Sequence, residues 1–158
     1  MTHHKSGITL LELLIVITLI SVTFCIAIPA YRNLILKTQN QTNVKRLVNA
    51  LHFARTQAIL KKQIISVCPY SADLNCGNDW SAGIIIYNKK QILRVIEPFK
   101  DAIIVWNRKQ SRIEFLADGR IKGHNGTFYY HNKQKQQASY RAVILSITGR
   151  IRLNHEKE

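Results

Sequence analysis

The sequence is poor in glycine, proline and acidic residues, and each shortage limits what the chain can be. It holds 7 glycines and 3 prolines among 158 residues. No glycine occurs between Gly7 and Gly77, and Pro29 is the only proline before Pro69, so nothing else interrupts a helix in that stretch. We therefore expect one long helix at residues 8–62. The composition is otherwise that of an ordinary globular protein, which excludes a disordered chain.

The shortage of acidic residues makes the chain strongly basic. It has 9 Asp and Glu against 23 Lys and Arg, a formal net charge of +14. A field of this sign favours polyanions, either nucleic acid or an anionic lipid surface, although it identifies no site by itself. A basic surface that is merely solvated is the alternative that the composition leaves open.

Cysteine is also scarce, with 3 in the chain. Cys25 lies in an apolar stretch, whereas Cys68 and Cys76 flank a loop-like segment rich in turn residues. Because such a segment can fold back and bring its ends together, we predict a Cys68–Cys76 disulfide, which persists in an oxidising compartment. Free buried thiols or metal ligands are the alternative, but no second Cys or His pair stands at zinc spacing.

No group of residues has the spacing of a catalytic or metal site. The 6 histidines show no metal-ligand spacing, and no serine lies in a nucleophile elbow. We therefore expect no enzymatic activity, no metal and no cofactor.

A long apolar run begins close to the N-terminus. Between Ile8 and Ile28 the only charged residue is Glu12. At about 1.5 Å per residue, the run matches the ~30 Å hydrocarbon core of a bilayer, so we predict a membrane-spanning helix. The one clear small-residue cleavage site, Ser6-Gly7, precedes the run, so cleavage there would leave the apolar helix on the mature protein.

This order of residues resembles the leader of type IV pilins and pseudopilins. Lys5-Ser6-Gly7 is followed by a hydrophobic residue, by Glu12 at the fifth position after Gly7, and by an aliphatic run. The resemblance implies that a prepilin peptidase removes residues 1–7 and that the new N-terminus at Ile8 is methylated. It also implies that Glu12 pairs with the freed amine of a neighbouring subunit during filament assembly. Ile8 departs from the phenylalanine that is usual in these families.

Glu12 is unusual in this run because it is a charged residue within an apolar segment. A charged side chain at the centre of a membrane helix costs about 2.5 to 3.5 kcal/mol on insertion scales, so it needs a partner or a function. A side chain that lies at the interface and snorkels is the alternative.

The orientation of the span is not given by its flanking charges. Basic residues are more numerous after the span than before it, the reverse of the positive-inside bias. We nevertheless expect a single-pass inner-membrane protein with a periplasmic C-terminal domain, extracellular once assembled in a pilus. The disulfide and the leader both require this orientation, and long domains translocate largely regardless of charge.

Beyond the span, apolar residues such as Val44, Leu47 and Leu51 recur at helical spacing, while Arg46 and Arg55 are expected to point away from them. This half of the helix should pack against a domain. In residues 63–158, short β-branched and aromatic runs alternate with turn residues, as is typical of antiparallel sheets. The expected strands are residues 64–67, 83–87, 92–97, 103–106, 112–116, 119–122, 127–131 and 141–147.

The fold class that follows is α+β and pilin-like, with a long N-terminal helix, membrane-spanning in its first half, packed on antiparallel β-sheets. With two sheets, the plan resembles the GspH/FimT branch of the pilin superfamily. Residues 1–7 would be the leader, residues 8–62 the helix and residues 63–158 the β-rich domain.

The C-terminal segment holds the strongest candidate site. Interpreted as one strand, residues 143–153 put aliphatic residues on one face and Arg150 and Arg152 on the other, about 6.6 Å apart. Guanidinium groups bind phosphate bidentately. Gly149-Arg150-Ile151-Arg152 resembles the GRxR motif of FimT-type minor pilins, and the resemblance implies that both arginines bind DNA during natural transformation. The other candidate DNA-binding residues are Gly149, Lys133, Lys135 and Arg141.

The same residues also have interpretations that involve no binding of DNA. Two exposed arginines at the end of an edge strand also discourage edge-to-edge pairing. A second basic turn, residues 118–123, repeats the pattern with Arg120 and Lys122, but a simple hairpin is the favoured interpretation. Three tyrosines could stack on unpaired bases, although sheet or core positions are favoured for them; they are Tyr129, Tyr130 and Tyr140.

The sequence thus predicts a minor type IV pilin that binds extracellular DNA for uptake, mainly by phosphate contacts and without regard to base sequence. The expected partners are DNA, other pilin subunits, the prepilin peptidase and, before assembly, the inner membrane. The alternative is structural: a GspH-like pseudopilin of a type II secretion system, or a minor pilin that primes assembly and binds no DNA.

Overall fold

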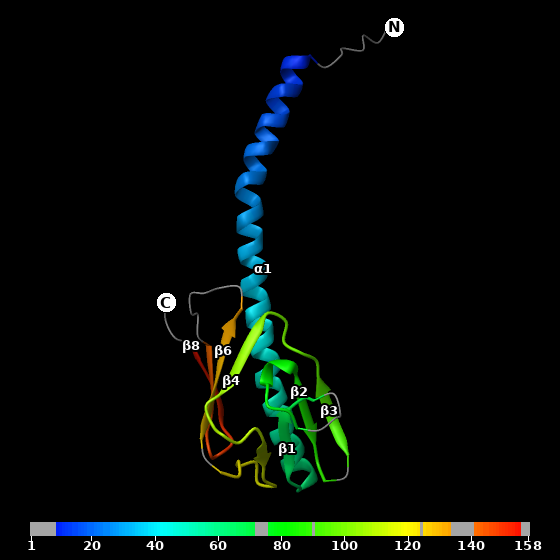
Figure 1. The fold of residues 1–158 in the computed structure, drawn as a ribbon, viewed down its shortest axis with the longest axis vertical. Helices are drawn as coiled ribbons and strands as arrows, with labels where there is room; N and C mark the ends of the chain where they lie inside the picture. The colour runs from blue at the N-terminus through cyan, green and yellow to red at the C-terminus, as the bar shows by residue number, and fades with distance from the viewer. Residues whose placement is uncertain (1–8, 72–75, 90, 124, 134–140, 156–158) are drawn as a thin grey trace. The chain divides into compact units, whose positions relative to one another are not determined.

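The computed structural model describes residues 9–71, 76–89, 91–123, 125–133 and 141–155. The chain divides into two compact units, Met1–Gln39 and Asn40–Glu158. One helix, α1 (Leu10–Lys61), passes through both, as the shortage of glycine and proline predicts. The strands all belong to the second unit (Figure 1).

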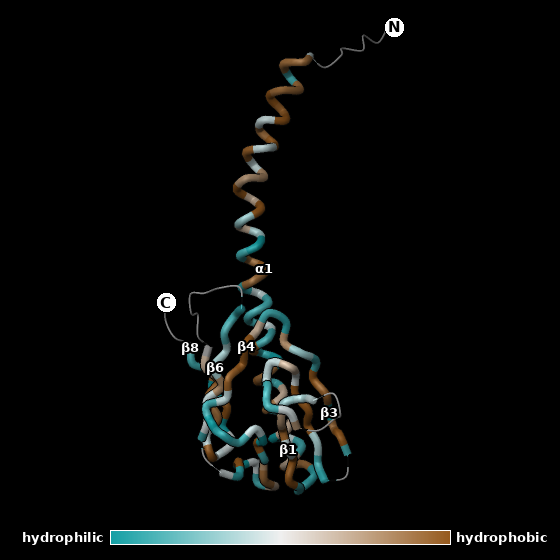
Figure 2. The backbone as a smooth tube through the Cα atoms, viewed as in Figure 1, coloured by the Kyte–Doolittle hydropathy of each residue, from teal (hydrophilic) through white to brown (hydrophobic). Residues whose placement is uncertain are grey.

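In the first unit the helix is apolar and exposed. Figure 2 shows hydrophobic residues along most of it, and α1 is the one described helix long and apolar enough, by length and composition, to cross a membrane. Three hydroxyl groups, those of Thr18, Ser21 and Thr23, donate to helix carbonyls three or four residues earlier. Because these hydroxyls are satisfied within the helix, none of the three needs a partner in hydrocarbon.

The second unit contains two four-stranded antiparallel sheets, with strand orders β3-β2-β1-β5 and β4-β6-β7-β8. A short 3-10 helix, η1 (Trp80–Ala82), precedes β2. This arrangement confirms the expected α+β, pilin-like architecture. The strands are β1 (Ile65–Pro69), β2 (Ile84–Tyr87), β3 (Ile92–Ile96), β4 (Ala102–Trp106), β5 (Ile113–Phe115), β6 (Gly126–Asn132), β7 (Arg141–Leu145) and β8 (Ile151–His155).

One hydrophobic core joins the second half of α1 to the inner faces of both sheets. The helix contributes Leu47 and Leu51, the first sheet Phe115, and the second sheet Phe128 and Tyr130, all almost fully buried. Among the described residues, every buried hydrophobic side chain lies between residues 44 and 145. The core of the second unit is therefore contained within that unit.

The predicted disulfide is confirmed. Cys68 in β1 and Cys76 are joined, with their Cα atoms 5.4 Å apart, and the thiol of Cys25 is free and exposed. The bridge closes a short loop at the end of β1, where the backbone amide of Gly77 also donates to the carbonyl of Pro69 (2.8 Å). Two independent links therefore join the described residues Cys76 and Gly77 to β1.

Two expectations about strands are wrong. Residues 143–153 form two strands, β7 and β8, joined by a tight turn, because Gly149 adopts a left-handed φ of +74° that closes the chain on itself. Ile147, expected in the core, is consequently 48% exposed. Residues 119–122 form no strand; only Ile121 pairs there, in a single bridge to Phe115.

Candidate nucleic-acid interface

Arg152 lies at the start of β8, an edge strand of the second sheet, and Arg150 is the last residue of the turn that precedes this strand. This turn, residues 146–150, is closed by two backbone hydrogen bonds, from Ser146 N–H to the Arg150 carbonyl (2.9 Å) and from Gly149 N–H to the Ser146 carbonyl (2.8 Å). Arg152 is paired with Ile144 in register. Both arginines are exposed. We refer to residues 146–150 as the C-terminal turn.

A second turn with the same geometry occurs at residues 116–120, which we refer to as the upstream turn. Leu116 N–H donates to the Arg120 carbonyl (2.7 Å), and Gly119 N–H donates to the Leu116 carbonyl (2.8 Å). Gly119 has a φ of +81°, close to that of Gly149. Thus the similarity between the two basic segments of the sequence extends to their backbone conformation.

The two turns pack directly against each other. A Cβ atom added to Gly149 would lie 1.9 Å from the carbonyl oxygen of Gly119, so only glycine permits the observed approach. Next to this contact, Ile121 N–H donates to the Ile147 carbonyl (3.0 Å). This backbone bond links the end of the upstream turn, which belongs with the first sheet, to the C-terminal turn, which belongs with the second.

Arg55 of α1 bonds to both turns. Its Nε donates to the Gly119 carbonyl (3.1 Å) and its Nη2 donates to the Thr148 carbonyl (3.4 Å). The planar fork of a guanidinium can reach two acceptors in this way, whereas a lysine ammonium offers a single point charge. Arg55 is half-buried, so the expectation that it points away from the domain is wrong.

The same expectation is wrong for Arg46. It donates to the Glu97 carbonyl (2.9 Å) and lies over the ring of Phe99, 5.0 Å from the ring centroid. Sequence periodicity assigned both arginines to the solvent face because it treats charged residues as solvated. A long side chain at the margin of the apolar stripe can instead reach a neighbouring loop.

The two turns differ in how their charges are compensated. In the upstream turn, Arg120 pairs with Asp118 (Nε to Oδ2, 2.6 Å). The Arg120 backbone amide and then its side chain donate to this carboxylate and lower the pKa of Asp118 below its ordinary value. Among the described residues, Arg150 and Arg152 form no ion pair, so their charges are available to a ligand.

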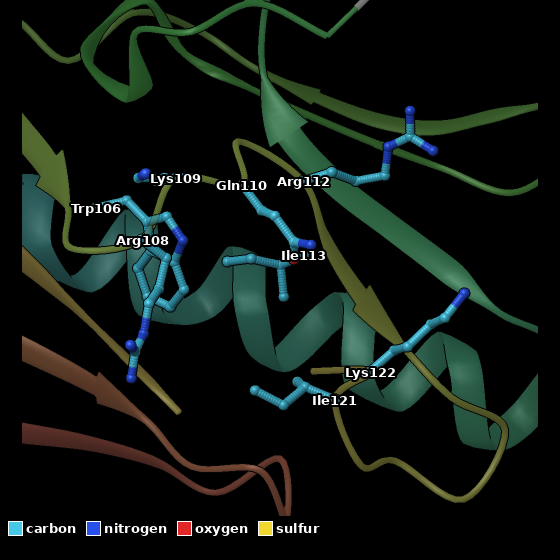
Figure 3. A pocket seen from close by; sticks show the side chains of 8 residues that line it. All are labelled: Trp106, Arg108, Lys109, Gln110, Arg112, Ile113, Ile121 and Lys122. Carbon is cyan, nitrogen blue, oxygen red and sulfur yellow. The ribbon is translucent and has the colours of Figure 1, made fainter. Parts of the chain in front are cut away.

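A basic pocket is lined in part by Ile121 and Lys122, the two residues that follow the upstream turn (Figure 3). It has a volume of about 170 Å³. In Figure 3, Ile113 and Ile121 face each other across it, with Arg112 and Lys122 pointing to one side and Arg108 to the other. Glu114 lies within ion-pair distance of both Lys122 (3.3 Å) and Arg112 (3.7 Å). The remaining lining residues are Trp106, Lys109 and Gln110.

This pocket is tied to the C-terminal turn through Asn125. Arg108 Nε donates to the Asn125 carbonyl (2.7 Å), and the Asn125 side chain accepts from the Ile147 amide. Sequence reasoning missed the loop of residues 107–112. The available signal was the run Asn-Arg-Lys-Gln-Ser-Arg, three cations within five residues between two strands.

Not all candidate residues come near the C-terminal turn. β6 begins at Gly126, which pairs with Leu145 beside that turn, so Lys133, beyond the other end of β6, lies at the opposite end of the sheet. Arg141 pairs with His155, also at that far end. Lys135 lies outside the described residues.

The remaining sequence candidates are placed as follows. Tyr130 is buried in the core and Tyr129 is exposed, while Tyr140 lies outside the described residues. Gly7 and Ile8 also lie outside them. Glu12 is exposed in the first turn of α1, where its backbone amide donates to Thr9 Oγ1 (3.2 Å). Within the described residues, no cluster of His, Cys, Asp or Glu side chains could hold a metal ion.

Comparison with known proteins agrees with this architecture. The crystal structure of the type IV minor pilin FimU from Pseudomonas aeruginosa superposes with a TM-score of 0.64, at 21% identity, over 75% of this chain and 90% of that chain. The minor pseudopilin EpsH from the type 2 secretion system of Vibrio cholerae gives a TM-score of 0.54, at 12% identity, over 74% and 97%. No curated protein matches the sequence.

Two family models match the sequence itself. The model of the prokaryotic N-terminal methylation motif matches residues 2–24, which fits processing by a prepilin peptidase, inner-membrane anchoring and assembly with other pilin subunits. The model of the type II transport protein GspH matches residues 43–149, more than half of the chain. The chain therefore belongs to the type IV pilin-like GspH family, whose members are structural pilins and pseudopilins.

Proposed function

We propose that this protein is a minor type IV pilin that binds extracellular DNA through its C-terminal turn during natural transformation. The observation that carries the proposal is the pair Arg150 and Arg152, exposed and without an ion-pair partner among the described residues. In a chain with a net charge of +14, two uncompensated guanidinium groups at the start of an edge strand are suited to phosphate.

The support behind these arginines favours binding over a purely repulsive role. The turn that carries them is fixed by its own hydrogen bonds, by the close approach to Gly119 and by Arg55. A preorganised turn loses little conformational entropy when a ligand binds. An arginine that serves only to discourage edge pairing needs charge and no such rigidity.

The pocket cations extend the same positive region. Arg108, Lys109 and Arg112 lie on a loop that is bonded, through Asn125, to the C-terminal turn. Because these groups contact phosphate rather than base edges, binding would be salt-dependent and indifferent to sequence. Lys133, Lys135 and Arg141 remain candidate DNA-binding residues, and Lys133 lies at the far end of the sheet.

The N-terminal unit supplies the anchor in this proposal. The prepilin peptidase would cleave after Gly7, and the amine of Ile8 would pair with Glu12 of a neighbouring subunit in the filament. The C-terminal unit would face the periplasm before assembly, where the Cys68–Cys76 disulfide can persist, and the cell exterior afterwards.

The test is binding of the Asn40–Glu158 unit to a fluorescent DNA duplex, followed by anisotropy over a range of salt concentrations. We expect Arg150→Gln/Arg152→Gln to lose most of the affinity and to reduce the salt slope by about two, roughly one for each phosphate contact. The matched control is Lys45→Gln/Lys89→Gln, which removes the same charge at two exposed positions on α1 and beside β2. Equal losses of affinity in the two variants would show that Arg150 and Arg152 contribute only general surface charge.

The second candidate function is a structural pseudopilin of a type II secretion filament. The similarity in fold to EpsH and the position of β8 at a sheet edge favour it. Such a protein would show only weak, nonspecific attraction to DNA, and Arg150→Gln/Arg152→Gln would then affect filament assembly rather than DNA uptake.

A further inference from the structure

The outer face of the second sheet carries an exposed aromatic residue in a central strand. In the register of this sheet, Val105, Tyr129, Ala142 and Asn154 form one row across β4, β6, β7 and β8. Phe128 and Tyr130, the neighbours of Tyr129 in β6, are buried against α1, so Tyr129 points to the opposite face. Tyr129 is 39% exposed and Val105 beside it is 47% exposed.

Arg152 belongs to this same face. It pairs with Ile144, which pairs with Thr127, two residues before Tyr129 in β6. With strands ~4.8 Å apart and ~3.3 Å per residue, the Cα atoms of Tyr129 and Arg152 lie about 12 Å apart. A short stretch of nucleic-acid strand that contacts Arg152 with a phosphate therefore reaches Tyr129.

The chemistry of this face suits a polyanion with flat apolar groups. None of the described residues of β4, β6, β7 and β8 that point outward is acidic. The exposed apolar surface lies in the row next to Arg152. A sheet that shows an aromatic side chain in a central strand, with cations alongside, is the arrangement on which single-stranded nucleic acids stack their bases.

We propose that this face binds unpaired bases of single-stranded DNA, with Tyr129 as the stacking surface, Val105 beside it, and Arg152 on the adjoining phosphate. This inference rests on the proposed function and adds to it a second mode of contact. In a duplex the bases are stacked inside the helix and reach no flat sheet, so duplex DNA uses the cationic side chains alone. An unpaired strand gains the stacking contact as well.

The experiment measures anisotropy with the full chain in detergent micelles and three fluorescent probes: a 20-mer of deoxythymidine, a 20-base-pair duplex, and an abasic 20-mer with the same phosphates and no bases. We expect Tyr129→Ala to weaken binding of the deoxythymidine strand by about fivefold to hundredfold. The duplex and the abasic strand should change by less than about twofold, because neither stacks a base on the sheet.

Two further variants provide the controls. Tyr129→Phe keeps the ring and should restore wild-type binding of the deoxythymidine strand. Val105→Ala should weaken it, whereas Val95→Ala, at a residue 46% exposed in the first sheet, should not. Unchanged duplex binding by Tyr129→Ala also shows that the variant is folded.

The inference is overturned if Tyr129→Ala leaves binding of the deoxythymidine strand unchanged, or weakens all three probes equally. The first result, with duplex binding still dependent on Arg150 and Arg152, would leave the proposed function standing and assign this apolar face to contact with another pilin subunit. If wild-type protein binds none of the probes, both the proposed function and this inference fail.

Discussion

Gly149 and Gly119 meet so closely that a Cβ atom on the first would lie 1.9 Å from the carbonyl oxygen of the second. The two residues belong to turns with the same conformation, one connected to each sheet, and Arg55 donates a hydrogen bond to each turn. The candidate DNA-binding arginine Arg150 is the next residue after one of these glycines. Its position therefore depends on a contact between segments that are distant in the sequence.

The packing of the two glycines can be tested by comparing alanine substitutions. Both residues have a positive φ, so each substitution carries a similar backbone strain of about 1 to 3 kcal/mol. At Gly119 the new methyl group would meet the flexible end of Ile59, but at Gly149 it would meet backbone. We expect Gly149→Ala to lower the free energy of unfolding more than Gly119→Ala, measured by urea denaturation. Equal losses would show that φ alone requires these glycines.

Arg55 should act on DNA binding without contacting DNA. Arg55→Lys keeps the charge but lacks the two separate nitrogens, Nε and Nη2, that reach the two turns, so we expect a loss of about 1 to 2 kcal/mol in stability and a severalfold loss of duplex affinity. Urea denaturation and anisotropy measure the two effects. If affinity depended on net charge alone, the lysine variant would bind as well as the wild type, which is the result that would contradict a positioning role.

We expect the ion pair with Asp118 to weaken the contact that Arg120 of the upstream turn can make with DNA. Asp118→Asn keeps an acceptor for the Arg120 backbone amide but removes the charge that pairs with its guanidinium. We expect a severalfold gain in duplex affinity, measured by anisotropy, that disappears when Arg120→Gln is added. No gain in the single variant would exclude Arg120 from the interface.

The ion pair of Asp118 with Arg120 also predicts the direction in which the stability of the protein changes with pH. The pKa of Asp118 is held below its ordinary value of 3.8 in the folded protein, so its contribution to stability is present above that value and is lost as pH falls through the lower, folded one. In thermal unfolding at decreasing pH, the wild type should therefore lose more stability below about pH 4 than Asp118→Asn does. Parallel curves would mean that the pair contributes nothing measurable.

The disulfide should contribute to the stability of the second unit. Closing a loop as short as that between Cys68 and Cys76 stabilises by roughly 2 to 3 kcal/mol in the chain-entropy model. We expect Cys68→Ala/Cys76→Ala to lower the free energy of unfolding by this order, and a reducing agent to do the same to the wild type. The double variant should not respond to the reductant. A response would mean that the effect arises elsewhere, and adding Cys25→Ala would then test whether the free thiol is its source.

Much of the fold could be predicted from local patterns. The long helix follows from a stretch without glycine and with one internal proline, and the disulfide follows from turn residues between two nearby cysteines. The prediction failed at Gly149, where a strict alternation of apolar and polar residues was given more weight than the Thr-Gly turn signal within it. The correct choice needed the register of β7 with β8.

The sequence by itself determined elements whose causes lie within a few residues: the apolar helix, most of the strands, the closed cysteine loop and the turn at Asp118-Gly119, but not the turn at Gly149. Only the tertiary structure decided that these turns pack together, that Arg55 holds them from 64 and 93 residues away, and that Lys133 lies at the far end of the sheet. The physical reason is that hydrogen bonding within a turn is local, whereas contacts between turns depend on how the helix and both sheets share one core.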